Sequence, residues 1–250
     1  MRRVVRIALP NAVQAYLRRR QRSVRLRSSS VILGIERDWK LARQSHALKS
    51  VLSVLQRMMG PRERCMYCVD SHGTDIEHFR PKGRFPARAY HWANMLLCCS
   101  ECGRFKGSQF PTAGRHPLLI DPTAEDPWRH LDFDPDTGNL TARFDVGAND
   151  WSARGSKTVE VLRLDRREGM AAGYSRTYRR LGDIVRGAFA SLASGARTPA
   201  ELLAVLEPAD DHGLLPWCFG CAGQELEPFC SLREQYPHVW AHCVAVVCSS

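Results

Sequence analysis

Apolar residues recur with a helical period in the first quarter of the chain. From Ile32 to Met59 they stand about 3.6 residues apart, which is typical of an amphipathic helix. Gly60 and Pro61 follow directly, and this pair ends helices. The pattern therefore predicts one long helix over Ile32–Met59.

The start of the chain has a different pattern. Val4, Val5 and Ile7 ahead of Pro10 predict a short strand within residues 1–10. A helix is then expected over Ala12–Arg20. The polar run Ser28–Ser30 is expected to form a hinge before the long helix.

Beyond residue 115 the pattern alternates between turn-rich and helical stretches. Leu131–Phe133 and Leu140–Phe144 flank an Asp-Thr-Gly turn at residues 136–138, which predicts a β-hairpin. Helical periodicity returns in four later segments: Lys157–Leu164, Arg166–Ser194, Pro199–Leu206 and parts of 229–247. We therefore expect an α+β fold, a mainly helical single domain. Its parts are a basic N-terminal arm with helices (1–60), a cysteine-rich module (61–115), and a hairpin and helical part (116–250).

The charge distribution favours a polyanionic partner. The chain has a formal net charge of +10, and nine arginines precede residue 28, whereas the first acidic residue is Glu36. Arginine makes bidentate phosphate contacts, so this segment suits a nucleic-acid backbone. A solvated basic face, an arm that neutralises an acidic partner subunit, and an organelle transit peptide are the alternatives. No run of about 18 apolar residues exists, so we expect no membrane span and a cytoplasmic location.

The ten cysteines include two closely spaced pairs in the predicted module. Cys65 and Cys68 form one C-x-x-C motif, and Cys99 and Cys102 form another. Two such motifs can place four thiolates tetrahedrally around Zn²⁺, and a closed Cys₄ site is structural rather than catalytic. The alternative is four ordinary buried thiols. Cys98 breaks the spacing and is expected to pack inward.

The residues between the two cysteine pairs resemble the HNH (ββα-metal) endonuclease family. The order is C-x-x-C, Glu77-His78-Phe-x-Pro-Lys82, Trp92-x-Asn94, C-x-x-C and x-x-Lys106-Gly. More narrowly, the chain is similar to the HNH component of Septu-type and retron-associated anti-phage systems. The opening segment with Pro10, the Leu-Leu-Ile-Asp-Pro run at 118–122 and Val161–Leu164 extend this resemblance, which covers roughly residues 1–190.

The resemblance implies a role for each residue. His78 matches the general base, and Glu77 matches the carboxylate ligand of a catalytic Mg²⁺ or Mn²⁺. Asn94 matches the residue that fixes the loop orienting the histidine. Three basic residues are expected to hold nucleic-acid phosphates: Arg80, Lys82 and Lys106. Trp92 is expected in the core rather than as a base-stacking platform.

One position departs from the family pattern. Gly103 stands where the family usually has Asn or His as a further ligand of the catalytic ion. The expected function is a metal-dependent HNH endonuclease acting on DNA, with RNA left open, as the effector of a defence complex with an ATPase subunit. The alternative is a weakened or inactive zinc-stabilised subunit that binds nucleic acid or a partner.

The sequence gives little support to other classes of function. It contains no G-x-S-x-G motif, no P-loop and no G-x-G-x-x-G between a strand and a helix, so any ATP use belongs to a partner. A further C-x-x-C, Cys218 and Cys221, leaves a second metal site open, although buried thiols are the preferred interpretation.

Overall fold

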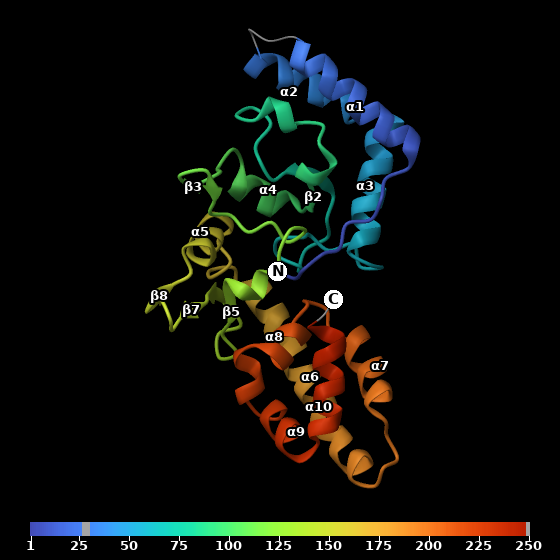
Figure 1. The fold of residues 1–250 in the computed structure, drawn as a ribbon, viewed down its shortest axis with the longest axis vertical. Helices are drawn as coiled ribbons and strands as arrows, with labels where there is room; N and C mark the ends of the chain where they lie inside the picture. The colour runs from blue at the N-terminus through green and yellow to red at the C-terminus, as the bar shows by residue number, and fades with distance from the viewer. Residues whose placement is uncertain (27–30, 249–250) are drawn as a thin grey trace. The chain divides into compact units, whose positions relative to one another are not determined.

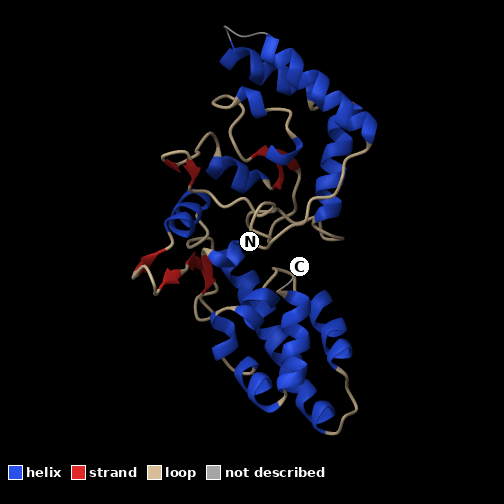
Figure 2. Ribbon diagram, in the orientation of Figure 1, coloured by secondary structure: helices blue, strands red, loops and turns tan. Residues whose placement is uncertain are grey.

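The structure is a computed structural model that describes residues 1–26 and 31–248. Within these residues it is helix-rich with small two-stranded antiparallel sheets (Figure 2), which confirms a mixed, mainly helical fold. Two compact units form. The N-terminal unit is Val4–Ala124, and the C-terminal unit combines residues 1–3 with the chain from Glu125 onward. The predicted hinge at Ser28–Ser30 lies outside the described residues.

The predicted long helix is two helices. α2 covers Val31–Ala42 and α3 covers His46–Met58. Ser45 is extended (φ −69°, ψ 152°), and its hydroxyl accepts a hydrogen bond from the Leu48 amide at 3.3 Å. A serine N-cap of this kind stabilises a new helix start, so a second helix begins where the apolar periodicity predicted one continuous helix.

The first ten residues form no strand, so that prediction was wrong. Val4 donates one backbone hydrogen bond to the Pro122 carbonyl at 2.8 Å, while Val5 remains 66% exposed. A β-strand needs backbone hydrogen bonds to a neighbouring strand at several successive positions, and one bond does not provide them. The helix predicted over Ala12–Arg20 is confirmed as the middle of α1 (Asn11–Leu26).

A strand–strand–helix arrangement lies at the centre of the N-terminal unit. β1 (Asp75–His78) pairs antiparallel with β2 (Met95–Cys98), and α4 (Ser100–Lys106) follows (Figure 1). Every residue of β2 is buried, and α3 packs against this strand. The connection between the strands, here called the β1–β2 loop (residues 79–94), contains the short helices η1 (Pro86–Arg88) and η2 (Trp92–Asn94).

The C-terminal unit begins with the predicted hairpin. β5 (Leu131–Phe133) pairs with β6 (Leu140–Ala142), which confirms it. Gly138 has a φ of +79°, and a Cβ there would lie 2.3 Å from the Ala171 carbonyl oxygen, so the turn requires glycine. The helices of the unit are α5 (Ala153–Leu162), α6 (Glu168–Ala193), α7 (Pro199–Ala209), α8 (Leu215–Gly220), α9 (Phe229–Gln235) and α10 (Pro237–Val247).

The predicted helical segments beyond residue 150 thus correspond to α5, α6, α7, α9 and α10, whereas the sequence did not predict α8. The remaining short elements are β3 (Thr112–Ala113), β4 (His116–Pro117), η3 (Pro127–Arg129), β7 (Phe144–Asp145), β8 (Asp150–Trp151) and η4 (Ala222–Glu225).

Candidate active site and metal centre

The two cysteine pairs meet in one buried cluster. Cys65, Cys68, Cys99 and Cys102 are all buried, and their sulfur atoms lie within 4.8 Å of one another. Zn–S bonds of about 2.3 Å give a tetrahedron with edges of about 3.8 Å. The Cys68 and Cys99 sulfurs are 3.9 Å apart, close to that edge. The cluster can therefore hold a metal ion such as zinc.

Backbone geometry around the cluster prepares it for thiolates. The Cys102 amide donates to the Cys99 sulfur at 3.4 Å, and Cys99 is the N-cap of α4. Hydrogen bonds, first from Cys102 and then from Cys65 and Cys99, hold the pKa of the Cys68 thiol well below its ordinary value, whereas burial raises the pKa of Cys65. The thiolate is the metal-binding form, and a bound cation would stabilise it at all four cysteines.

Cys98 lies outside the cluster, as predicted. Its side chain is 1% exposed, and its thiol donates to the Cys99 carbonyl at 3.2 Å. In the C-terminal unit Cys218 is buried and Cys221 half-buried. Among the described residues, only the Cys65 cluster brings together three or more residues of metal-ligating type. The structure therefore assembles no second metal site from Cys218 and Cys221 in that part of the chain.

His78 ends β1 and is 4% exposed. Its Nε2 lies 2.9 Å from the carbonyl oxygen of Ala89, on the β1–β2 loop. A carbonyl can only accept, so Nε2 carries the proton and Nδ1 is left as an acceptor. Burial, followed by the charges of Lys82 and Lys106, lowers the pKa of His78 to about 3. The imidazole is therefore neutral at physiological pH.

Asn94 ties the β1–β2 loop together from the inside. Its Oδ1 accepts from the Arg80 amide at 2.8 Å, and its Nδ2 donates to the carbonyls of Arg80 and Arg88 at 3.0 and 3.1 Å. The side chain is buried, and both of its amide hydrogens are used. These contacts brace the two ends of the β1–β2 loop against each other.

Glu77 is engaged by a buried lysine. The Lys106 ammonium is 2.7 Å from the Glu77 Oε1 and 2.8 Å from the His78 carbonyl oxygen, and Lys106 is 0% exposed. Burial raises the pKa of Glu77 even though Lys106 opposes the shift. Lys106 was expected to hold a nucleic-acid phosphate. With its ammonium buried against Glu77, a phosphate contact would first require this pair to separate.

The other carboxylates beside His78 are also paired with cations: Asp75 with Arg43 and Glu36 with Lys82. Asp75, two residues before Glu77 on β1, is held by Arg43, whose Nη2 lies 3.0 Å from both carboxylate oxygens. Gly103 on α4 supplies no side chain, although a Cβ there would meet only the Cys98 sulfur, at 3.8 Å. Among residues 1–26 and 31–248, the four cysteines form the one cluster of three or more potential metal ligands. The expected Mg²⁺ or Mn²⁺ site does not fit the arrangement of these residues.

A basic cleft of about 590 Å³ opens beside Glu77 and His78. Its lining includes Lys82 and Arg84 from the β1–β2 loop. Lys82 also pairs with Glu36 at 3.0 Å. Arg80, expected at phosphates, instead lies over the rings of Phe85 and Phe110, at 5.6 and 5.2 Å. Three further cations of the cleft were not predicted from the sequence: Arg37, Lys40 and Arg43.

These three residues lie on α2 or directly after it, more than 30 residues before His78. In the sequence, these cations are marked only by their place on one segment with Trp39. In the structure, the centre of the Trp39 ring lies 4.3 Å from the centre of the His78 ring. Trp39 is 6% exposed, so it forms the apolar wall behind the histidine.

Comparison with known proteins relates the chain to Septu proteins. It is 31% identical to a protein named Septu protein PtuB from Bacillus mycoides (strain KBAB4), over 53% of this chain and 52% of that protein. A second Septu protein PtuB, from Bacillus thuringiensis, is 28% identical over 41% of this chain and 37% of its own length. Septu protein PtuA of the same B. mycoides strain is 29% identical over 41% of this chain and 18% of that protein.

The chain spans about half the length, or less, of these curated relatives. No protein-family model matches it. In the described part of the chain, no helix combines the length and apolarity that crossing a membrane requires.

Proposed function

We propose that this protein is an HNH-type endonuclease that hydrolyses phosphodiester bonds of DNA. The observation that carries the proposal is the His78–Ala89 hydrogen bond beside a basic cleft. That bond places the proton on Nε2 and leaves Nδ1 as the acceptor, which is the tautomer that a general base needs. The order of β1, β2 and α4 around a Cys₄ cluster supports the same conclusion.

Each residue of the site has a task in this proposal. His78 takes a proton from the attacking water at Nδ1. Lys82 and the cations of α2 hold the phosphodiester in the cleft and stabilise its developing charge. Asn94 keeps the β1–β2 loop in place, so that Ala89 continues to hold the imidazole. The zinc bound by the four cysteines ties β2 and α4 to the segment before β1.

A catalytic Mg²⁺ or Mn²⁺ would supply charge stabilisation at the phosphate if it bound. The residues present offer such an ion little, because Glu77 is paired with Lys106 and Gly103 has no side chain. A bound phosphate would add oxygens for the ion, and Mg²⁺ often uses few protein ligands.

The same two observations favour a second candidate function. Without a ligand at position 103, and with Glu77 held by Lys106, the chain would be a zinc-stabilised subunit that binds nucleic acid or a partner without cutting. In either case the Septu relatives support a role in an anti-phage defence system. We propose an ATPase subunit as the partner, on the family resemblance.

Plasmid cleavage with Mg²⁺ or Mn²⁺ tests the proposal. Zinc-loaded wild type is compared with His78→Ala and Gly103→Asn, the latter being tolerated sterically because only Cys98 lies near the new Cβ. Cutting by wild type that disappears in His78→Ala supports the nuclease. Cutting only by Gly103→Asn means that the scaffold lacks a ligand, and the second candidate is then correct.

If no variant cuts, the assay is repeated with the partner ATPase subunit present. Cutting in that mixture that depends on His78 supports a partner-controlled nuclease. Continued absence of cutting in the complex contradicts the nuclease proposal and favours the binding subunit.

A further inference from the structure

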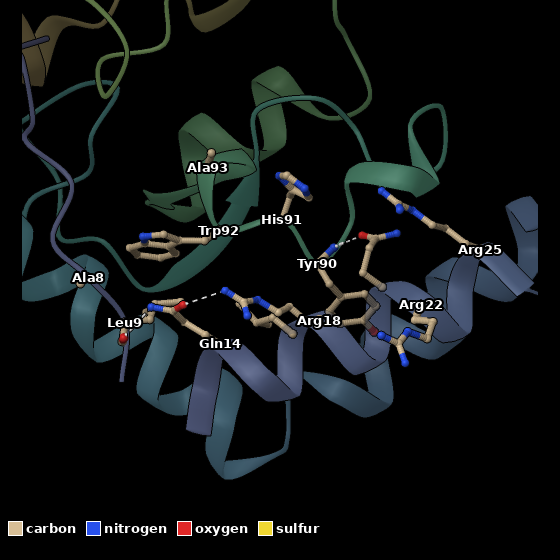
Figure 3. Close-up of a pocket in the computed structure, with 12 residues that line it drawn as sticks. Ala8, Leu9, Gln14, Arg18, Arg22, Arg25, Tyr90, His91, Trp92 and Ala93 are labelled. Atoms are coloured by element: carbon tan, nitrogen blue, oxygen red, sulfur yellow. Dashed lines mark hydrogen bonds between the residues drawn. The ribbon is translucent and has the colours of Figure 1, made fainter. Parts of the chain in front are cut away.

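A second hollow of the N-terminal unit lies between α1 and the β1–β2 loop. Its volume is about 580 Å³, within the range of pockets that bind small ligands or single nucleotides. We call it the α1 groove. One wall carries Arg18, Arg22 and Arg25, and the other carries Tyr90–Ala93 (Figure 3).

The three arginines share one face of α1. They are spaced by four and three residues, so their side chains follow one line along the helix. Arg20, by contrast, turns toward Asp38, with its Nη2 3.1 Å from the carboxylate. No acidic side chain lines the groove, and within the described residues Arg18, Arg22 and Arg25 form no ion pair. The groove is therefore a mainly apolar hollow bordered by three positive charges that no carboxylate of the described residues offsets.

The opposite wall carries rings and is braced by hydrogen bonds. The Arg6 guanidinium lies 5.0 Å from the centre of the Trp92 ring and donates to the carbonyls of Trp92 and Ala93 at 2.9 and 3.1 Å. From α1, Gln21 accepts from the Tyr90 amide at 2.9 Å and donates to the Pro86 carbonyl at 3.1 Å. These polar ties fix the wall before any ligand arrives, which reduces the entropy lost on binding.

Trp92 is placed for contact with a ligand. This residue was predicted to lie in the core, but it is half-buried and lines the groove. His91 beside it is exposed, and partial desolvation followed by the charges of Arg88 and Arg25 lowers its pKa. A neutral ring and an indole next to a line of guanidinium groups suit a ligand with both flat rings and negative charges.

The geometry points to single-stranded nucleic acid as the occupant. We propose that its phosphates bind Arg18, Arg22 and Arg25 while an unpaired base packs against Trp92. The seven-residue step from Arg18 to Arg25 rises about 10 Å along the helix, and a stacked strand advances roughly 3.4 Å per nucleotide. About three nucleotide steps fit in that length, so the line is long enough for a phosphate at each arginine. A base reaches a hollow of this kind only when it is unpaired, which favours a single strand over a duplex.

This groove is a separate site from the cleft at His78. The two hollows share no lining residue. Binding in the groove also needs no divalent ion and no general base. The inference therefore stands or falls independently of the proposed nuclease activity.

Fluorescence anisotropy with fluorescein-labelled dT12 tests the inference. Zinc-loaded full chain is titrated without Mg²⁺ at several salt concentrations. Changing Arg18, Arg22 and Arg25 together to Gln should weaken binding by about 100-fold, roughly fivefold for each arginine. The slope of log affinity against log salt should fall by about 2, since each contact to a single strand contributes about 0.7.

A matched triple variant controls for net charge. Arg19, Arg57 and Arg115 are exposed arginines of the same unit that line neither hollow. Their joint change to Gln removes the same three charges and should alter dT12 affinity by no more than about threefold. An equal loss in both triple variants would mean that only overall charge matters, which overturns the proposal.

Trp92→Leu separates the base from the backbone. It should weaken dT12 binding by about tenfold, and Trp92→Phe should restore most of the affinity. Neither change should affect inorganic polyphosphate, which has charges but no bases. Duplex DNA of the same length that binds as tightly as dT12, with Trp92→Leu neutral, would contradict a single-strand site, and so would absence of dT12 binding by wild type.

The outcomes distinguish this inference from the nuclease proposal. His78→Ala should bind dT12 like wild type, because the groove does not include that residue. Normal dT12 binding by a chain that never cuts would refute only the nuclease. Cleavage that persists while the arginine triple variant still binds dT12 normally would refute only the groove.

Discussion

Removing the Lys106 ammonium is expected to destabilise the N-terminal unit strongly. Lys106 is 0% exposed and pairs with Glu77, whose side chain is 18% exposed. Lys106→Met keeps most of the volume but leaves the Glu77 carboxylate buried without its cation. Breaking a buried pair on one side costs about 3–5 kcal/mol. Because burial already raises the pKa of Glu77, the carboxyl should then take up a proton at a higher pH than in wild type.

The double variant Lys106→Met/Glu77→Met is the matched control. It removes both charges together, so the remaining cost should be about 1 kcal/mol, from the lost bond between Lys106 and the His78 carbonyl. Urea unfolding of zinc-loaded protein, followed by tryptophan fluorescence, measures the free energy of unfolding for all three proteins. Lys106→Met and the double variant should therefore differ by at least about 2 kcal/mol. Equal stabilities for wild type and Lys106→Met would refute a buried ion pair.

The same variant tests why a divalent ion does not fit. With Lys106 absent, the Glu77 carboxylate is free to bind Mn²⁺, and an ion at ten times its dissociation constant adds about 1.4 kcal/mol of stability. We expect Mn²⁺ to stabilise Lys106→Met and to leave both wild type and the double variant unchanged. Equal stabilisation of wild type would show that Lys106 does not exclude the ion, and the reasoning about Glu77 would be wrong.

Three further predictions concern the loop, the zinc and the histidine. Asn94→Ala removes three hydrogen bonds to the β1–β2 loop and should lower the free energy of unfolding by about 3 kcal/mol in urea titrations; a loss below 1 kcal/mol would contradict the bracing role. Cys65→Ser should abolish stoichiometric zinc in metal analysis, whereas Cys98→Ser should retain it. The pKa of His78 is about 3 when folded and about 6.5 when unfolded, so the unfolded state binds more protons between these values. Stability should therefore fall below pH 6.5, by about 1.4 kcal/mol at pH 5.5 from this group, and His78→Phe should remove that part of the loss.

Local patterns were enough to predict most helices and the cysteine cluster. The 3.6-residue period of α6 and the Asp-Thr-Gly turn of the β5–β6 hairpin depend on neighbouring residues alone. The four cysteines stand in two C-x-x-C motifs whose spacing is itself a geometric constraint. Two errors were also local. The period through Ser45 concealed a helix N-cap, and Val4–Ile7 had the alternation of a strand without a neighbouring strand to pair with.

The long-range pairings were decided only by the tertiary structure. Lys106 looked like one of several phosphate-binding lysines, but the fold buries it against Glu77, 29 residues earlier. The arginines of α1 formed one undivided basic run in the sequence. Packing against Tyr90 and Asp38 turns Arg20 inward, while Arg18, Arg22 and Arg25 remain at the groove. Spacing along a chain determines which residues share a helix face or a C-x-x-C motif. Burial and ion pairing, in contrast, depend on segments that meet only when the chain has folded.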